Sequence, residues 1–149
     1  LVGPVADQAY ATALAGDIAR LDLQAHVRLR GHVRDVGAVL ARWDAFVSLS
    51  RDEGQGLAVL EAMASGVPVV ARPAPGVEDV VVDDQTGVVV AVDSPGGVAA
   101  AIARGLDVAV GARLVRAARQ LVSRRYRWQR TVAAIEAVYR QARQARPSR

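Results

Sequence analysis

The sequence predicts an α/β fold, a Rossmann-like parallel sheet with helices on both faces. Short apolar runs alternate with helical patterns five times along 149 residues, joined by connections of about two to six residues. Hydrophobic residues make up 52% of the chain but aromatic residues only 4%, so the core must consist of Val, Ala and Leu. Such a mixture suits buried parallel strands packed closely against Ala-rich helices.

The first helix is expected from Asp7 to Leu21. The Asp7 side chain can cap its amino terminus, and Ile18 and Leu21 are spaced as a buried stripe. Apolar runs of strand length occur between the helical patterns. Strands are therefore expected at 1–3, 27–29, 45–49, 67–71 and 86–91.

The later helices have recognisable ends. A helix over 57–65 is expected to stop at Gly66, because glycine takes the left-handed conformation at a helix C-terminus without strain. Ser94 and Pro95 cap and start a helix that continues to about Leu106. Further helices are expected at 36–43, 113–124 and 127–143, and a short helix or turn at 77–82.

The composition excludes several kinds of chemistry. Cysteine is absent, so disulfides, thiolate nucleophiles and cysteine-bound metals are excluded. His26 and His32 are the only histidines, and no metal site or other cofactor is expected. The chain contains neither the ~20 consecutive apolar residues of a spanning helix nor a signal-peptide pattern at its start. A cytoplasmic protein is the resulting expectation.

Positive charge is concentrated near the carboxyl terminus. The formal net charge is +4 and every cationic side chain is Arg; residues 113–149 contain eleven Arg and a single acid, Glu136. This asymmetry is compatible with an anionic partner such as the inner face of a membrane or a nucleic acid. The alternation of these Arg residues with apolar positions favours the solvated face of an amphipathic helix instead. No nucleic-acid partner is expected, and peripheral membrane contact stays open.

Ligands of parallel sheets bind at the carboxyl ends of the strands, which directs attention to the loops after each strand. The loop after the strand at 45–49 contains Gly54 and Gly56 and leads directly into a helix. The glycines allow a tight turn and a close approach to a ligand. The free N–H groups of Gly56, Leu57 and Ala58 then point out of the positive end of the helix, which suits a phosphate. Many α/β proteins have such a loop without a ligand.

Glu61 is the only charged residue between Glu53 and Arg72. It lies about one helical turn after Leu57, on the same side as the helix start. Its carboxylate could accept two hydrogen bonds from vicinal hydroxyls, as in a ribose or hexose. A water-facing carboxylate explains the position equally well.

The residues from Ser50 to Ala71 form a longer pattern, Ser-x-x-Glu-Gly-x-Gly-Leu-x-x-Leu-Glu-Ala-Met-Ala-x-Gly-x-Pro-Val-Val-Ala. It resembles the signature of the family 4 retaining glycosyltransferases of GT-B fold, in which two glutamates are separated by seven residues. The resemblance continues at 27–33, 43–50, 76–81, 86–90, 126–128 and 138–139. It implies that residues 1–149 form a single donor-binding domain, the carboxyl-terminal half of a GT-B fold, ending in the helices at 113–143.

The resemblance also implies a reaction and a set of roles. A sugar would pass from a nucleoside-diphosphate sugar to a glycan, lipid or small-molecule acceptor with retained configuration, and amides aimed at the departing diphosphate would stabilise its charge. For His32, a surface-loop histidine is an equally good interpretation. The implied site comprises Glu53 as the catalytic residue at the donor sugar, Gly54, Gln55, Gly56, Leu57 and Ala58 around the sugar and diphosphate, Glu61 at the ribose, and His32 and Val33 at the base.

The chain departs from the family pattern in three ways. Gln55 replaces an aromatic residue, most often Phe, between the motif glycines. The chain begins at what looks like the second strand, so the Arg and Lys that clamp the diphosphate have no counterpart. The acceptor-binding amino-terminal domain is absent, and we therefore expect the isolated chain to be inactive. Two alternatives stay open: a non-catalytic nucleotide-binding module that acts with a partner chain, and another GT-B enzyme such as a nucleotide-sugar epimerase.

Overall fold

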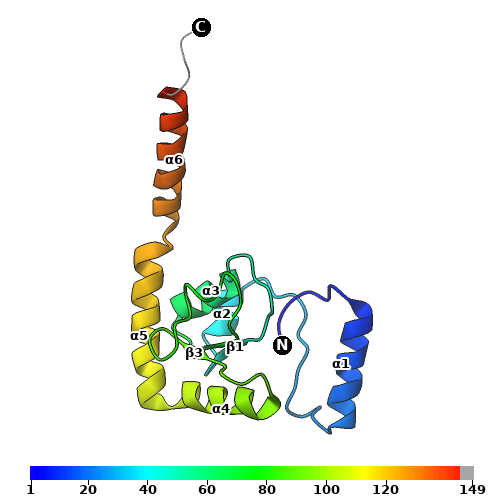
Figure 1. Ribbon diagram of the computed structural model, residues 1–149. Coiled ribbons are helices and arrows are strands. Elements are labelled where there is room, and N and C mark those ends of the chain that lie inside the picture. Colours follow the sequence, from blue (N-terminus) through cyan, green and yellow to red (C-terminus); the bar gives the residue numbers. More distant parts are fainter. Residues whose placement is uncertain (145–149) are drawn as a thin grey trace. The chain divides into compact units, whose positions relative to one another are not determined.

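The computed structural model describes residues 1–144. The chain divides into two compact units, Leu1–Ala38 and Val39–Arg149, and each is described by itself. Figure 1 shows the helices and strands of both units in sequence colours. The prediction of a single domain stays a prediction.

The first unit contains helix α1, Gln8–Arg20, and a short run of paired extended backbone. The Asp7 side chain accepts a hydrogen bond from the Tyr10 N–H at 3.0 Å, which confirms the predicted cap. The expected strands at 1–3 and 27–29 are not regular strands. Their remnant is a set of backbone hydrogen bonds between residues 1–3 and 28–31, in which the Gly3 N–H donates to the Gly31 carbonyl at 2.9 Å.

The buried stripe predicted for the first helix is wrong. Within the part of the chain that the structure describes, α1 has no buried residue, and Leu21 is 55% exposed. The physical reason is the size of this unit, since one helix and a short extended pair cannot enclose an apolar side chain. The 3.6-residue period was present, but the face it marks is only partly covered, since Leu14 and Ile18 are half-buried.

The second unit contains a parallel α/β sheet. Strand order is β1-β2-β3, and both pairs are parallel, with Phe46 opposite Val69 and Val70 opposite Val88. Helix α2, Val36–Leu40, crosses the boundary between the units. The other elements are β1 Phe46–Ser48, α3 Leu57–Ser65, β2 Val69–Ala71, β3 Val88–Val89, α4 Pro95–Leu106, α5 Val108–Arg125 and α6 Trp128–Gln144.

Helices cover both faces of this sheet, as predicted. Alternate residues of β2 point to opposite faces. Val69 and Ala71 pack with α3 and with Ala118 of α5. Val70 packs on the other face, in a second cluster that also contains Val88 of β3, Ala101 of α4 and Leu114 of α5. The α/β prediction is therefore confirmed.

Strand β1 lies at an edge of the described sheet, although two of its three residues, Phe46 and Val47, are apolar. The Phe46 N–H donates to Pro68 O at 2.8 Å and Ser48 O accepts from the Arg72 N–H at 2.9 Å, so both residues face β2. The backbone of Val47 consequently faces the other way, where no strand of the described residues pairs with it. Val47 is 38% exposed and Leu49 is 44% exposed.

Local capping residues set several helix ends. Gly66 has φ 82° and ends α3, and Ser94 Oγ accepts from the Gly97 N–H at 3.1 Å to start α4. Both agree with the predictions. Helix α5 begins at Val108 rather than 113, because the Asp107 carboxylate accepts hydrogen bonds from the N–H groups of Ala109 and Val110.

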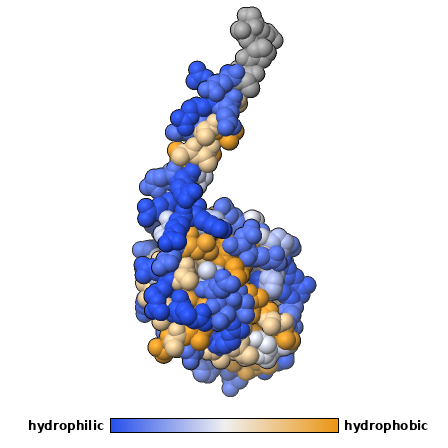
Figure 2. All heavy atoms as spheres, turned by 60° about the vertical axis from the view of Figure 1, so that its left-hand side comes forward, coloured by the Kyte–Doolittle hydropathy of each residue, from blue (hydrophilic) through white to orange (hydrophobic). Residues whose placement is uncertain are grey.

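Helix α6 is amphipathic but has no buried residue among those the structure describes. Trp128, Ile135 and Tyr139 are exposed. Figure 2 shows a largely hydrophilic surface on this helix, with a few hydrophobic atoms about midway along it. In residues 1–144, no helix combines the length and the apolar character that crossing a membrane requires.

Two aspartates connect the turn before β3 to helices α4 and α5. Asp83 Oδ1 accepts hydrogen bonds from the Val89 N–H at 2.8 Å and from Arg104 Nη2 at 2.9 Å. Asp84 Oδ1 pairs with Arg113 Nη2 at 2.7 Å. Partial burial alone would raise the pKa of Asp83, but the Val89 N–H and the Arg104 guanidinium together hold this pKa below its usual value.

Replacing Asp83 with Asn is expected to lower the free energy of unfolding at pH 7 by less than about 1 kcal/mol, because this ion pair is about half exposed. A carboxylate whose pKa falls on folding stabilises the protein above its unfolded pKa of about 3.9 and loses that contribution as pH falls through the folded value. The difference between parent and variant should therefore shrink below about pH 4. Urea unfolding at pH 7 and at pH 3 measures both values.

The matched control for this prediction is Asp79→Asn. Asp79 is exposed on the same stretch and has no hydrogen-bond or ion-pair partner among the described side chains. Its replacement should change stability equally little at both pH values. A gap between parent and Asp83→Asn that widens on acidification would contradict the assigned role of Asp83.

Candidate functional site

The candidate site lies where β1 and β2 end. Residues 49–56 follow β1 and residues 72–77 follow β2, so both loops leave the same edge of the parallel sheet. The loops also touch. A methyl group added at Gly76 would lie 2.5 Å from Glu53 O and 2.8 Å from Gly54 O. The second loop is therefore pressed against the backbone of the first.

The first loop ends in a helix start that no side chain caps. Gly56 has φ 58° and ψ 43°, and its carbonyl accepts the first helical hydrogen bond, from the Leu60 N–H at 3.0 Å. The N–H groups of the first turn have no earlier carbonyl to bind, and the first turn of α3 carries no acidic side chain. Leu57 and Ala58 are exposed. The positive end of α3 is thus open to an anion.

Two glutamates flank this helix start. Glu53 is half-buried in the loop, whereas Glu61 is exposed on α3. The opposite side of α3 is buried in the core through Val59, Ala62 and Met63. In the portion of the chain that the structure describes, neither carboxylate is engaged in a hydrogen bond or an ion pair. Both retain their full capacity to accept hydrogen bonds from a ligand.

The structure brings most of the predicted site residues together. Glu53, Gly54, Gln55, Gly56, Leu57, Ala58 and Glu61 all belong to one continuous loop and helix of the second unit. Gln55 is exposed in the loop, so its amide group is in contact with solvent. His32 is exposed and Val33 half-buried in the first unit, and their predicted place at a base pocket stays a prediction.

Arg72 is a cation of this edge to which the sequence analysis assigned no role. It directly follows β2 and its side chain is only 20% exposed. Its guanidinium pairs with the carboxylate of Asp93, which follows β3. The sequence signal that could have pointed to Arg72 is a charged residue immediately after an apolar strand. Its ion pair could not be predicted in this way, because the partner lies in another loop. Arg72 also lines a cavity of about 320 Å³ together with Pro73, Val77, Glu78, Val81, Val82, Asp83 and Val89.

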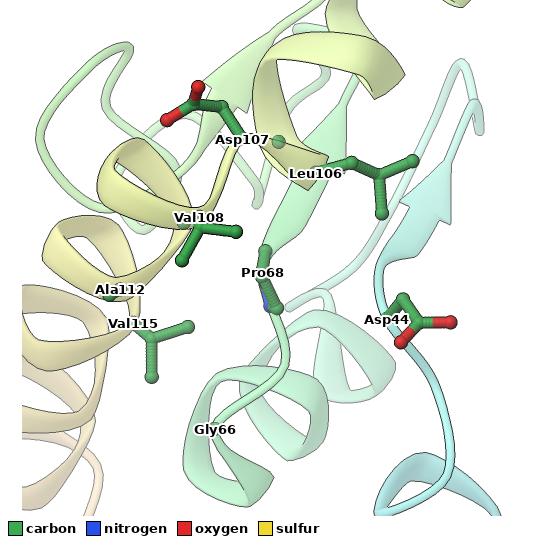
Figure 3. A pocket seen from close by; sticks show the side chains of 10 residues that line it. Asp44, Gly66, Pro68, Leu106, Asp107, Val108, Ala112 and Val115 are labelled. Carbon is green, nitrogen blue, oxygen red and sulfur yellow. The ribbon is translucent and has the colours of Figure 1, made fainter.

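A second cavity of about 320 Å³ lies at the opposite edge of the sheet, beside Pro68 at the start of β2. Figure 3 shows Pro68 between Val108 of α5 and Asp44, with the carboxylates of Asp44 and Asp107 pointing away from each other. In a ligand pocket a few polar groups usually converge on the ligand, whereas the two carboxylates at this cavity do not converge. The loops at the carboxyl edge are therefore the stronger candidate. Within residues 1–144, no three His, Cys, Asp or Glu side chains are grouped as metal ligands.

The parallel sheet, its two layers of helices and the glycine-rich loop at its carboxyl edge match the corresponding domain of GT-B glycosyltransferases of known structure, so this is a GT-B type domain. The structure of HepE from Anabaena in complex with UDP and glucose matches with a TM-score of 0.83 and 26% identity, over 92% of this chain and 40% of that one. Sucrose-phosphate synthase from Thermosynechococcus elongatus matches with a TM-score of 0.85 and 28% identity, over 98% of this chain and 38% of that one. Residues 1–107 match the family model of the group 1 glycosyl transferases, and the chain belongs to this family.

Curated relatives point to the same family. Glycogen synthase of Mycobacterium tuberculosis is 39% identical over 115 residues, which cover 75% of this chain and 28% of that protein. D-inositol 3-phosphate glycosyltransferase of Xylanimonas cellulosilytica is 40% identical over 121 residues, covering 74% of this chain and 27% of that protein. The chain thus spans less than a third of the length of these two relatives.

Proposed function

We propose that this chain is the donor-binding domain of a retaining, family 4 type glycosyltransferase. The donor is a nucleoside-diphosphate sugar, and the observation that carries the proposal is the uncapped start of α3 between Glu53 and Glu61. Membership of the group 1 glycosyl transferases supports it. The likeness to HepE, whose structure contains UDP and glucose, supports the choice of donor class.

Each part of the site has a role in this proposal. The amides from Gly54 to Ala58 hold the diphosphate, whose negative charge grows as its bond to the sugar breaks. Glu61, one turn into the helix, accepts hydrogen bonds from the ribose hydroxyls. Glu53 lies at the loop and contacts the hydroxyls of the sugar. An acceptor hydroxyl forms the new bond to the sugar on the face from which the diphosphate leaves, and its proton passes to the departing diphosphate oxygen.

The isolated chain is proposed to bind the donor without transferring the sugar. Transfer needs an acceptor site and cations for the diphosphate, and the chain spans only 28% of the length of the mycobacterial glycogen synthase. Transition-state stabilisation by such groups is usually worth several kcal/mol each. Detectable sugar transfer by the purified chain would overturn this part of the proposal.

Calorimetric titration tests the donor role directly. UDP, GDP and ADP and the glucose and mannose derivatives of each are titrated into the chain. One diphosphate is expected to bind, and its sugar derivative to bind more tightly, because Glu53 adds contacts to the sugar. Failure of all three diphosphates and of their sugar derivatives would refute the proposed function.

A further inference from the structure

We propose that Gly76 is a positioning residue for the donor site, holding Glu53 and the amides after it through the loop Arg72–Val77. This inference rests on the proposed function for its effect on donor binding. Gly76 touches no substrate in this scheme. It acts through the backbone of residues 53–58, called the motif loop below. Gly76 contacts this loop from the loop that follows the neighbouring strand, β2.

The two loops interlock through a pair of glycines. Gly76 has φ 79°, and a side chain there would lie 2.5 Å from Glu53 O and 2.8 Å from Gly54 O. Gly56 has φ 58°, and a side chain there would lie 3.4 Å from both Gly76 O and Val77 Cγ2. Each glycine thus permits a close approach of the other loop, and the two approaches together leave the Glu53 carbonyl little freedom to move.

The loop that presses on Glu53 is itself held firmly. Pro73 and Pro75 restrict its backbone angles, and Ala74 and Val77 are each 2% exposed. The Ala74 carbonyl accepts from the Val77 N–H at 3.0 Å, closing the turn that contains Gly76. The Arg72 N–H donates to Ser48 O at 2.9 Å, and the Arg72 side chain pairs with Asp93. A stiff loop can therefore fix the position of its softer neighbour.

Glu53 and Gly54 otherwise have few means of staying in place. Gly54 and Gln55 are exposed, and the Glu53 side chain has no partner in the described structure. Donors arranged in advance around a diphosphate stabilise it far more than donors that must be ordered on binding. A displacement of about 1 Å in such a site can cost roughly 100-fold in rate. The contact at Gly76 supplies the order that the motif loop lacks.

Gly76 is constrained twice, by its positive φ and by the nearby carbonyls, and the two constraints can be separated. Asparagine tolerates a positive φ but carries a β carbon. Gly66 provides the matched position, because its φ is 82° while the atoms nearest to a side chain there belong to the flexible Arg119 side chain, at 3.5 Å or more. Asn should therefore be tolerated at 66, where only φ is restrictive, and rejected at 76, where the carbonyls are in the way.

The experiment compares Gly76→Ala and Gly76→Asn with Gly66→Ala and Gly66→Asn. At 15.7 kDa the chain suits backbone NMR. Both Gly76 variants should shift the amide resonances of residues 53–58 and lower their order parameters from about 0.85 to below about 0.6. Their affinity for the nucleotide sugar that the titrations select should fall at least tenfold. Gly66→Asn should match the parent protein, and Gly66→Ala should lose stability without either change in the motif loop.

The outcomes separate this inference from the proposed function. If the parent chain binds no nucleotide sugar, the function fails, while the NMR comparison still tests the positioning role. Unchanged resonances and order parameters at 53–58 in the Gly76 variants would overturn the positioning role whatever the chain binds. If both Gly76 variants fail to fold, the double variant Pro73→Ala, Pro75→Ala replaces them, since it loosens the loop without adding atoms. It should lower the same order parameters, and a rigid motif loop in that variant would overturn the inference.

Discussion

Replacing Glu61 with Ala is expected to weaken nucleotide binding roughly 10- to 100-fold. Hydrogen bonds to a charged group contribute about 1.5–3 kcal/mol, and each 1.4 kcal/mol corresponds to a factor of ten in affinity. Glu61 is exposed on α3, so its removal leaves no cavity in the core. The loss should therefore appear in the dissociation constant measured by calorimetry and not in the melting temperature.

Two controls make this prediction specific. Glu136→Ala removes an exposed carboxylate from α6, outside the proposed site, and should leave nucleotide affinity unchanged. The 2′,3′-dideoxy form of the nucleotide lacks the hydroxyls that Glu61 is proposed to accept from. Parent and Glu61→Ala proteins should bind this analogue equally weakly. A Glu61→Ala penalty that persists in full with the analogue would remove Glu61 from the ribose site.

Replacing Leu114 with Ala is expected to lower the free energy of unfolding by about 2–5 kcal/mol, the usual range for a Leu truncated in a core. Leu114 is 1% exposed and packs in the cluster of Val70, Val88 and Ala101. The truncation leaves a cavity between the sheet and two helices, since these backbones are held by their own hydrogen bonds. Denaturant unfolding followed by circular dichroism measures the loss.

Leu106→Ala is the matched control, because it makes the same chemical change where the side chain is 48% exposed. It should cost well under half as much as Leu114→Ala. Near-equal losses in the two variants would show that the second cluster is not the tightly packed core described above. Equal nucleotide affinity in both folded variants would place the damage in stability alone.

The prediction of α3 succeeded because its signals are local. Gly56 and Gly66 bracket a run of good helix formers, and the helix occupies residues 57–65 as expected. The start of α5 was predicted too late because the Asp107 cap was not recognised as a helix signal. Strands were predicted longer than they are, since an apolar run marks where a strand can form and pairing decides how far it extends.

The candidate site likewise has a local part that the sequence predicts and a part, formed between loops, that the sequence does not predict. Its motif residues lie in one loop and the helix that follows, so the sequence alone was enough to predict Glu53, the amides to Ala58, and Glu61 as one site, and their roles stay predictions. The interlock of Gly76 with Glu53 and the pairing of Arg72 with Asp93 join separate loops, and sequence spacing carries no signal for either.

The sequence by itself determined the alternation of strands and helices in the second unit, the Asp7 cap of α1, the end of α3 at Gly66, the start of α4 at Ser94, and the motif that places this chain among the group 1 glycosyl transferases. These features depend on residues within one or two turns of each other. Only the tertiary structure decided which apolar faces are covered: β2 is wholly buried, whereas Val47 of β1 and Leu21 after α1 are exposed. The physical reason is that burial depends on which distant segments supply the opposing surface, and hydrophobic periodicity marks a face without showing what packs against it.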